Sequence, residues 1–260
     1  MTNGATTPSQ QMIWSLADLR ALETIRLGPS EVVYAFVSLV GEPSTMDEGL
    51  LDDEERRRAR RFVKATHGHR FVLAHAALRL FLARCLDLEP VTVRYESDTL
   101  GKPRLVSGLA PLEFNLSHSE SLGLLAVTRD RSVGVDIEHA RAVPDALDIA
   151  DRHFSPVERE ELRALPPAER QAAFFRCWTR KEAVIKTSGE GLSRALDSFD
   201  VDLAPDSTSA LKRMDGRSGQ EADLYLRDLP SPPGYAAAGA VAAPERLGLQ
   251  WRELSVETRE

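Results

Sequence analysis

The sequence predicts an α+β protein, a fold class in which helices and antiparallel strands do not alternate strictly. Segments with helical and strand-like patterns occur in both halves of the chain, and no short-period repeat is present. The 260 residues are enough for one large unit or two small ones. The 42% apolar share, with glycine added, is typical of a folded protein and excludes wholesale disorder.

The first half begins with a polar, patternless stretch over residues 1–12, which predicts a loose tail. The β-branched and aromatic run from Glu31 to Val40 predicts one buried strand. A helix is expected to begin near Leu51, because four acidic residues there precede three arginines, an order that suits the helix dipole. A second helix is expected over about Gly68 to Leu86.

That second helix would place Phe71, Leu78 and Leu82 on one apolar stripe. Beyond it, the segment from Val91 to Tyr95 is strand-like, and Gly101 to Pro103 predicts a turn.

Two short apolar runs in the middle of the chain predict a hairpin. They are Leu122 to Thr128 and Val133 to Glu138, and four polar residues separate them. A helix is expected from about Ala168 to Lys186, where a Pro-Pro pair precedes it and Gly189 suits a left-handed cap.

The end of the chain predicts a loop and then late strands. Residues 204–219 are polar and predict the loop. Tyr225 and the run from Tyr235 to Ala243 predict strands, whose small residues imply close backbone packing.

Charge and targeting features restrict the class of partner. The chain has 33 basic and 40 acidic side chains, so its net charge of -7 would repel a nucleic-acid backbone. Cys85 and Cys177 lie far apart without a CxxC pattern, which predicts reduced core thiols. The N-terminus shows no signal-peptide pattern, and charged residues interrupt the most apolar segment, Phe71 to Leu86. We expect a soluble, cytoplasmic protein with no membrane partner.

Two carboxylates share one face of the strand expected at 133–138. Asp136 and Glu138 point one way, and the apolar residues between them point the other. Carboxylates about 6–7 Å apart along a strand can converge on one hard divalent ion. The alternative is a solvated strand edge. Gly134 would leave open space beside the carboxylates.

A third carboxylate, Glu182, lies on the inward stripe of the later helix, between Trp178 and Ile185. One interpretation pairs it with Lys186, because a glutamate four residues before a lysine is a favourable helix pair. The other makes Glu182 a metal ligand and lets Lys186 reach a bound phosphate.

Ser117 and His118 lie at the end of an apolar run, in a segment that could hold a phosphate or sulfate. A hydrolase triad of these two residues with Asp136 is disfavoured, because no GxSxG elbow exists and adjacent strand residues point apart. The sequence also contains no P-loop and no GxGxxG pattern.

Five motifs in order make the chain resemble the 4'-phosphopantetheinyl transferases, in particular their long type, which is similar to the surfactin synthetase activating enzyme. The resemblance covers about residues 50 to 200. The motifs are an arginine-rich helix at Arg58 to Phe62, GKP at Gly101 to Pro103, FNLSHS at Phe114 to Ser119, GVDIE at Gly134 to Glu138 and WTRKEAVIK at Trp178 to Lys186.

The resemblance implies a pseudo-twofold pair of similar α+β halves with the active site in the cleft between them. The corresponding divisions are a lead-in over residues 1–30, an N-terminal half over 31–131 and a C-terminal half over 132–260 that carries the metal site. It also implies a monomer, because one chain contains both sides of the cleft.

The implied reaction transfers the 4'-phosphopantetheine group of coenzyme A to a serine of an acyl or peptidyl carrier protein, as in polyketide or nonribosomal peptide biosynthesis. The serine hydroxyl attacks the β-phosphate and releases adenosine 3',5'-bisphosphate. Mg²⁺ is the expected cofactor, with Mn²⁺ as a substitute.

The resemblance also assigns roles to residues. Asp136, Glu138 and Glu182 would hold the metal, and Glu182, Lys186 and Glu158 would serve catalysis. The residues implied in coenzyme A binding are Arg58, Lys102, Pro103, Ser117, His118, Asp136, Lys181 and Lys186. Glu182, Glu158 and an ion-bound water are all open as the acceptor of the serine proton.

Two other functions use the same residues. One is a Mg-dependent nucleotidyl or phosphohydrolase, and the other is a noncatalytic module that binds coenzyme A. Coenzyme A consumption with stoichiometric labelling of a carrier separates them. The sequence does not reveal which carriers are served or whether acyl-coenzyme A is accepted.

Overall fold

The computed structural model describes residues 12–106, 111–189, 194–205, 207, 210–243 and 248–255. It is a mixed α and β structure, as the sequence predicts. The loose tail expected over residues 1–12 lies almost entirely outside the described residues.

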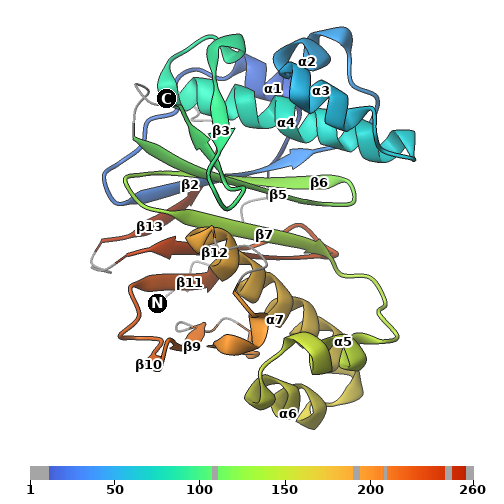
Figure 1. Cartoon of the computed structure of the whole chain (residues 1–260), viewed down its shortest axis with the longest axis vertical. Coiled ribbons are helices and arrows are strands. Elements are labelled where there is room, and N and C mark those ends of the chain that lie inside the picture. The colour runs from blue at the N-terminus through green and yellow to red at the C-terminus, as the bar shows by residue number, and fades with distance from the viewer. Residues whose placement is uncertain are drawn as a thin grey trace, which may run out of the picture.

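Four layers make up the molecule, in the order helices, sheet, sheet, helices (Figure 1). The first sheet has the strand order β1-β2-β6-β5, and β13 also pairs with β2. Its strands are β1 (Ile13–Trp14), β2 (Glu31–Ser38), β5 (Leu112–Ser119), β6 (Leu122–Arg129) and β13 (Gln250–Glu253). The helices that cover it are α1 (Leu16–Ala21), α2 (Thr45–Leu50), α3 (Asp53–Ala59) and α4 (Ala65–Leu86).

The second sheet has the strand order β11-β12-β7, and helix α7 packs against it (Figure 1). Its strands are β7 (Val133–His139), β11 (Leu224–Asp228) and β12 (Tyr235–Ala242). The helices of this part are α5 (Ala146–His153), α6 (Pro156–Ala164) and α7 (Pro167–Ser188).

Smaller elements complete the fold. A short antiparallel pair joins β3 to β4, and a three-stranded sheet has the order β10-β9-β8. Their bounds, with those of two 3₁₀ turns, are η1 (Pro90–Thr92), β3 (Tyr95–Ser97), β4 (Pro103–Leu105), η3 (Leu196–Ser198), β8 (Asp200–Val201), β9 (Leu211–Met214) and β10 (Arg217–Ser218).

Apolar side chains fill all three interlayer spaces. One core lies between the first helices and the first sheet, and another surrounds α7. A third core joins the two sheets face to face, with Val32, Tyr34 and Phe36 of β2 near Val135 and Ile137 of β7. Burial of apolar area at this central core is what holds the two sheets together.

The predicted hairpin between residues 122 and 138 is wrong. Both runs are strands, but β6 pairs with β5 and β2, whereas β7 pairs with β12 in the other sheet. The four polar residues between them therefore connect two sheets. The true hairpin is β5–β6, in which Glu120 adopts a left-handed φ of 49°.

Other element predictions hold in part. The helices expected near Leu51 and over 168–186 exist as α3 and α7, and Asp52 and Gly189 cap them. Of the segment 91–95, the first two residues belong to the 3₁₀ turn η1 and Tyr95 begins β3, whereas the residues between them are irregular. The polar stretch 204–219 contains β9 and β10. Strands as short as β9 and β10, with mostly exposed polar side chains, show no alternation of apolar and polar residues from which the sequence could predict them.

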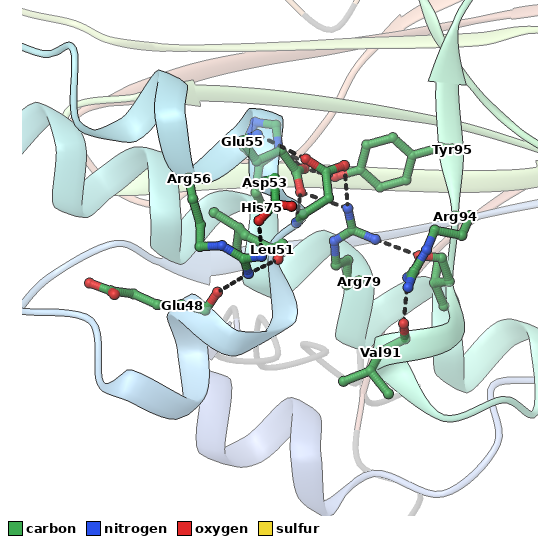
Figure 2. A network of polar contacts seen from close by, with 12 residues as sticks. Glu48, Leu51, Asp53, Glu55, Arg56, His75, Arg79, Val91, Arg94 and Tyr95 are labelled. Carbon is green, nitrogen blue, oxygen red and sulfur yellow. Dashed lines mark hydrogen bonds and ion pairs between the residues drawn. The ribbon is translucent and has the colours of Figure 1, made fainter.

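A buried polar network joins α3 to α4 (Figure 2). Arg79 of α4 is fully buried and donates to Glu55 Oε2 at 2.6 Å. The other Glu55 oxygen contacts His75 at 2.7 Å and accepts from the hydroxyl of Tyr95. This network fixes the helix that carries Arg58.

Candidate active site

Asp136 lies at the centre of the candidate site. Only 3% of this residue is exposed, and it lies on β7, the strand at the edge of the second sheet. Its Oδ1 accepts from Lys186 Nζ at 2.6 Å and from the Ser117 hydroxyl at 2.9 Å. Burial raises the pKa of Asp136, although the Lys186 ammonium acts against this. The interpretation of this strand face as a solvated edge is therefore wrong for Asp136.

Gly134 explains how Lys186 reaches Asp136. A Cβ at Gly134 would lie 2.2 Å from the carbonyl oxygen of Ala183 and 2.4 Å from the amide nitrogen of Thr187. The expected open space is therefore filled by the backbone of α7. Because glycine lets α7 lie directly on β7, Lys186 faces the strand carboxylates.

Glu182 does not form the helix pair with Lys186, which is one of its two interpretations. Among the described residues no hydrogen bond or ion pair of the Glu182 carboxylate is found, and Lys186 binds Asp136 instead. Burial raises the pKa of Glu182, and the nearby charge of Asp136 raises it further. A half-buried carboxylate of this kind is available to bind a cation or a proton.

Glu138 follows Asp136 on the same face of β7. The hydroxyl of Ser119 donates to its Oε2 at 2.7 Å. Burial raises the pKa of Glu138, and the negative charges of Asp136 and Glu182 add to that effect. The three carboxylates therefore interact electrostatically.

A cavity of about 530 Å³ opens beside Glu182 and Lys186. It joins residues from five separate segments of the chain. Its lining includes Gly101, Lys102, Pro103, Asn115, Leu116, Arg152, His153, Glu182, Ile185, Lys186, Arg194 and Leu196. The volume falls within the usual range of about 300–1,000 Å³ for small-molecule sites. Several cationic residues on its wall suit an anionic ligand.

Lys102 is buried in the wall of this cavity. Its ammonium donates to the carbonyl oxygens of Val133 at 3.1 Å and Thr187 at 3.0 Å. Burial lowers its pKa to about 8. Lys102 thus ties the glycine-lysine-proline turn to β7 and α7, and Pro103 follows it at the start of β4.

His118 points away from Ser117, as the alternation of a strand predicts. Ser117 is buried, whereas His118 keeps part of its surface exposed. Desolvation lowers the pKa of His118, and the charges of His75, Lys186, Arg70 and Arg58 lower it further. Cationic side chains therefore surround His118, and we call this part of the site its positive side.

Arg58 belongs to this positive side and is exposed on α3. Its guanidinium lies over the ring of Phe71, 5.3 Å from the centroid. Arg70, which the sequence analysis did not single out, pairs with Glu120 at 2.9 Å.

Lys181 and Glu158 lie elsewhere, in the core around α7. Both are 0% exposed, and Lys181 Nζ is 2.8 Å from Glu158 Oε1. The ammonium also donates to the carbonyl oxygens of Leu196 and Phe199, both at 2.7 Å. Glu158 caps α6 and accepts from the amide of Val201 at 2.7 Å. The pair lies in a closed core, and neither residue belongs to the lining of the cavity.

The donor set fits a hard divalent cation. Within the described ranges, Asp136 Oδ2 is one of four buried side-chain atoms that have no hydrogen-bond partner. Three nearby carboxylates offer only oxygen, the ligand that Mg²⁺ and Mn²⁺ accept readily. In the part of the chain described, no three His, Cys, Asp or Glu side chains are grouped tightly enough to hold an ion.

Comparison with known proteins decides the family. Residues 132–238 match the 4'-phosphopantetheinyl transferase superfamily. The chain is 39% identical to the 4'-phosphopantetheinyl transferase HetI of Nostoc sp. over 164 residues, which are 62% of this chain and 69% of that protein. It is 32% identical to Sfp of Bacillus subtilis over 196 residues, 75% of this chain and 84% of that one.

The chain belongs to the 4'-phosphopantetheinyl transferases. The resemblance stated from the motifs is confirmed, and the protein is a transferase of this class. A solved apo-ACPS structure from Chronobacterium ammoiniagenes is 21% identical, with a TM-score of 0.34, and covers 43% of this chain and 94% of that one.

Several site residues escaped the sequence analysis. Arg152, His153 and Arg194 line the cavity, and Asn115 and Ser119 join the sheets. Asn115 and Ser119 lie within the FNLSHS motif at positions alternate to Ser117, so strand periodicity could have found them. The cavity residues carry no such signal, because they come from α5 and from the chain after α7.

Proposed function

We propose that this transferase moves the 4'-phosphopantetheine group from coenzyme A to a serine of an acyl or peptidyl carrier protein and releases adenosine 3',5'-bisphosphate. The observation that supports this most is the buried Asp136, which Lys186 and Ser117 hold between the sheets beside a cavity with cationic walls. Reaction at a pyrophosphate requires groups that neutralise negative charge and fix its position.

Cationic residues supply that neutralisation for coenzyme A. Lys186, which pairs with Asp136 here, could bind a phosphate oxygen of coenzyme A instead. The positive side formed by Arg58, Arg70 and His118 suits a second phosphate. Lys102 and Pro103 line the cavity and would shape the nucleotide pocket rather than carry charge to it.

Asp136, Glu138 and Glu182 would hold a divalent cation, Mg²⁺ or Mn²⁺. The orphaned Asp136 Oδ2 and the raised pKa values of all three carboxylates support this set. Bound there, the ion would neutralise the pyrophosphate and the carboxylates together. In the absence of the ion, the ammonium of Lys186 neutralises part of the negative charge of Asp136.

Glu182 is the better candidate to take the proton of the attacking serine. It lines the cavity, and among the described residues no cation pairs with its carboxylate. Glu158 lacks these properties because Lys181 and Val201 occupy its oxygens in a closed core.

We also propose that the chain consists of two similar halves divided near residue 131, after a lead-in over residues 1–30, with the active site between them. Each half has a 22-residue helix, α4 or α7, against a sheet. β13 belongs to the first sheet by pairing although it follows the second in sequence.

A monomer is expected, because one chain supplies both sides of the site. Light scattering that showed a stable trimer would contradict this. No helix in the described part of the chain is long and apolar enough to cross a membrane, and the expected cytoplasmic location stays a prediction.

Mass spectrometry of a purified apo carrier protein tests the proposed function. The carrier is incubated with this protein, coenzyme A and Mg²⁺, and a gain of the phosphopantetheine mass on its serine is expected, with one adenosine 3',5'-bisphosphate per carrier. Cleavage of coenzyme A without carrier labelling would indicate a phosphohydrolase, and binding without turnover would indicate a noncatalytic module.

A further inference from the structure

Three polar side chains of β5 bridge the two sheets beside the candidate site. Asn115, Ser117 and Ser119 occupy alternate positions, so they project from the same side of the strand. Each accepts a hydrogen bond from a main-chain N–H of β7. The pairs are Asn115 Oδ1 with Val135 N at 2.9 Å, Ser117 Oγ with Ile137 N at 3.4 Å and Ser119 Oγ with His139 N at 3.1 Å.

These oxygens stand where main-chain carbonyls would stand between neighbouring strands of one sheet. The distance between β5 and β7 is therefore set by side chains of defined length. A substitution on β5 at one of these positions changes a contact between the sheets and leaves the ladder within each sheet intact.

Two of the three side chains also bind the carboxylates. Ser119 donates to Glu138 Oε2 at 2.7 Å and accepts from His139 N. A hydroxyl has one proton, so this pair of contacts fixes its direction. Ser117 makes the equivalent contact with Asp136 but shares it with Lys186.

We propose that Ser119 is a positioning residue, whose hydroxyl holds Glu138 in the orientation that cation binding requires and links that carboxylate to the spacing of the two sheets. The inference rests on the proposed function, in which Glu138 is a metal ligand. Among the described residues, Ser119 is the hydrogen-bond donor found at the Glu138 carboxylate, so no second contact replaces it.

Ser119 is also the position where the effect can be isolated. Ser117 contacts Lys186, so its loss would disturb phosphate binding as well. Asn115 contacts no carboxylate in the described part of the chain. Groups that orient a metal ligand from outside typically contribute a factor of about 10–100 to metal affinity.

Mn²⁺ titration of the full chain without coenzyme A, followed by electron paramagnetic resonance, measures the effect without catalysis. Ser119→Ala should raise the Mn²⁺ dissociation constant by about 10–100-fold. Ser119→Thr keeps the hydroxyl and should remain near wild type. Ser121→Ala is the matched control, because Ser121 lies in the adjoining turn, 3.1 Å from the Tyr235 hydroxyl, and binds no carboxylate of the described residues.

A double variant separates positioning from folding. In a Glu138→Gln background, Ser119→Ala should weaken Mn²⁺ binding no further, because both changes remove the same ligand. If Ser119→Ala does not fold, Ser119→Cys supplies a side chain of similar shape and weaker hydrogen bonding, and should show the same loss of affinity.

Unchanged Mn²⁺ affinity in folded Ser119→Ala, or a full additional loss in the Glu138→Gln background, would overturn the inference. A Ser119→Ala variant that lost thermal stability but bound Mn²⁺ as tightly as wild type would also overturn it. The proposed function is tested separately by carrier labelling. Labelling by wild type together with unchanged Mn²⁺ binding in Ser119→Ala refutes only the role of Ser119. Absence of both Mn²⁺ binding and labelling in wild type refutes the metal set and the proposed function together.

Discussion

A single buried carboxylate, Asp136, organises the candidate site at the scale of residues. A lone charge in this position would be costly, and Lys186 and Ser117 offset that cost through Oδ1. Oδ2 has no partner in the described part of the chain. The residue is thus held rigidly by one oxygen while the other is free to bind a ligand.

A second buried carboxylate, Glu55, controls acid stability. Burial acts to raise its pKa, but hydrogen bonds with His75, Tyr95 and Arg79 outweigh burial and lower the pKa from 4.5 to about 2. The folded state therefore binds fewer protons than the unfolded state between these values. Its contribution, about 3 kcal/mol, is fully present above pH 4.5 and is lost as the pH falls toward 2.

Glu55→Gln should therefore unfold more easily at neutral pH and lose less stability between pH 4.5 and 2 than wild type. Urea unfolding at several pH values measures both. Equal slopes of unfolding free energy against pH for the two proteins would contradict the assignment.

At the scale of elements, contact between α7 and β7 brings the residues of the candidate site together. Gly134→Ala would place a methyl group within 2.2 Å of the Ala183 carbonyl, so α7 must shift. We expect a loss of about 1–3 kcal/mol in stability, typical of overpacking, and slower transfer by the folded enzyme. Gly49→Ala in α2 is the control, because nothing lies within 4 Å of its new methyl group. Equal effects of the two changes would contradict close packing as the cause.

The Lys181–Glu158 pair joins α7 to α6 and to the segment that follows α7. Lys181→Met should cost about 3–5 kcal/mol, because it leaves a buried charge without a partner. Adding Glu158→Gln removes that charge and should restore part of the stability. Carrier modification per folded molecule should persist in the double variant. A well-folded double variant without transfer would return both residues to the catalytic set.

The sequence predicted local features of the whole molecule better than their assembly. Strand alternation correctly placed Asp136 and Glu138 on one face, and the capping residue Gly189 correctly marked the end of α7. Periodicity carries no information about which strands pair. It therefore missed that β6 and β7 enter different sheets and that β13 returns to β2.

The sequence pattern also did not reveal the different roles of the charged residues on α7. Lys181 and Lys186 lie five positions apart on one helix, yet one is fully buried against Glu158 and the other faces the cavity. The sequence could not separate them, because burial of a lysine depends on partners brought from η3 and α6.

The return of β13 predicts cooperative unfolding of the whole chain. Leu254 accepts from the Trp14 indole at 3.2 Å, and Arg252 pairs with Glu31, so the C-terminal segment closes the first sheet. Denaturation followed by tryptophan fluorescence and by far-ultraviolet circular dichroism should give coincident transitions. Two well-separated transitions would show that the halves unfold independently.

The initial rate of carrier modification against Mg²⁺ concentration tests the candidate site most directly, for Asp136→Asn, Glu182→Gln and the double variant. Each single change should leave the fold intact while transfer falls by orders of magnitude and more Mg²⁺ is required. The double variant should be little worse than either single variant, because residues that share one ion act as a unit. A Glu182→Gln enzyme with a near wild-type rate at ordinary Mg²⁺ would contradict the three-carboxylate site.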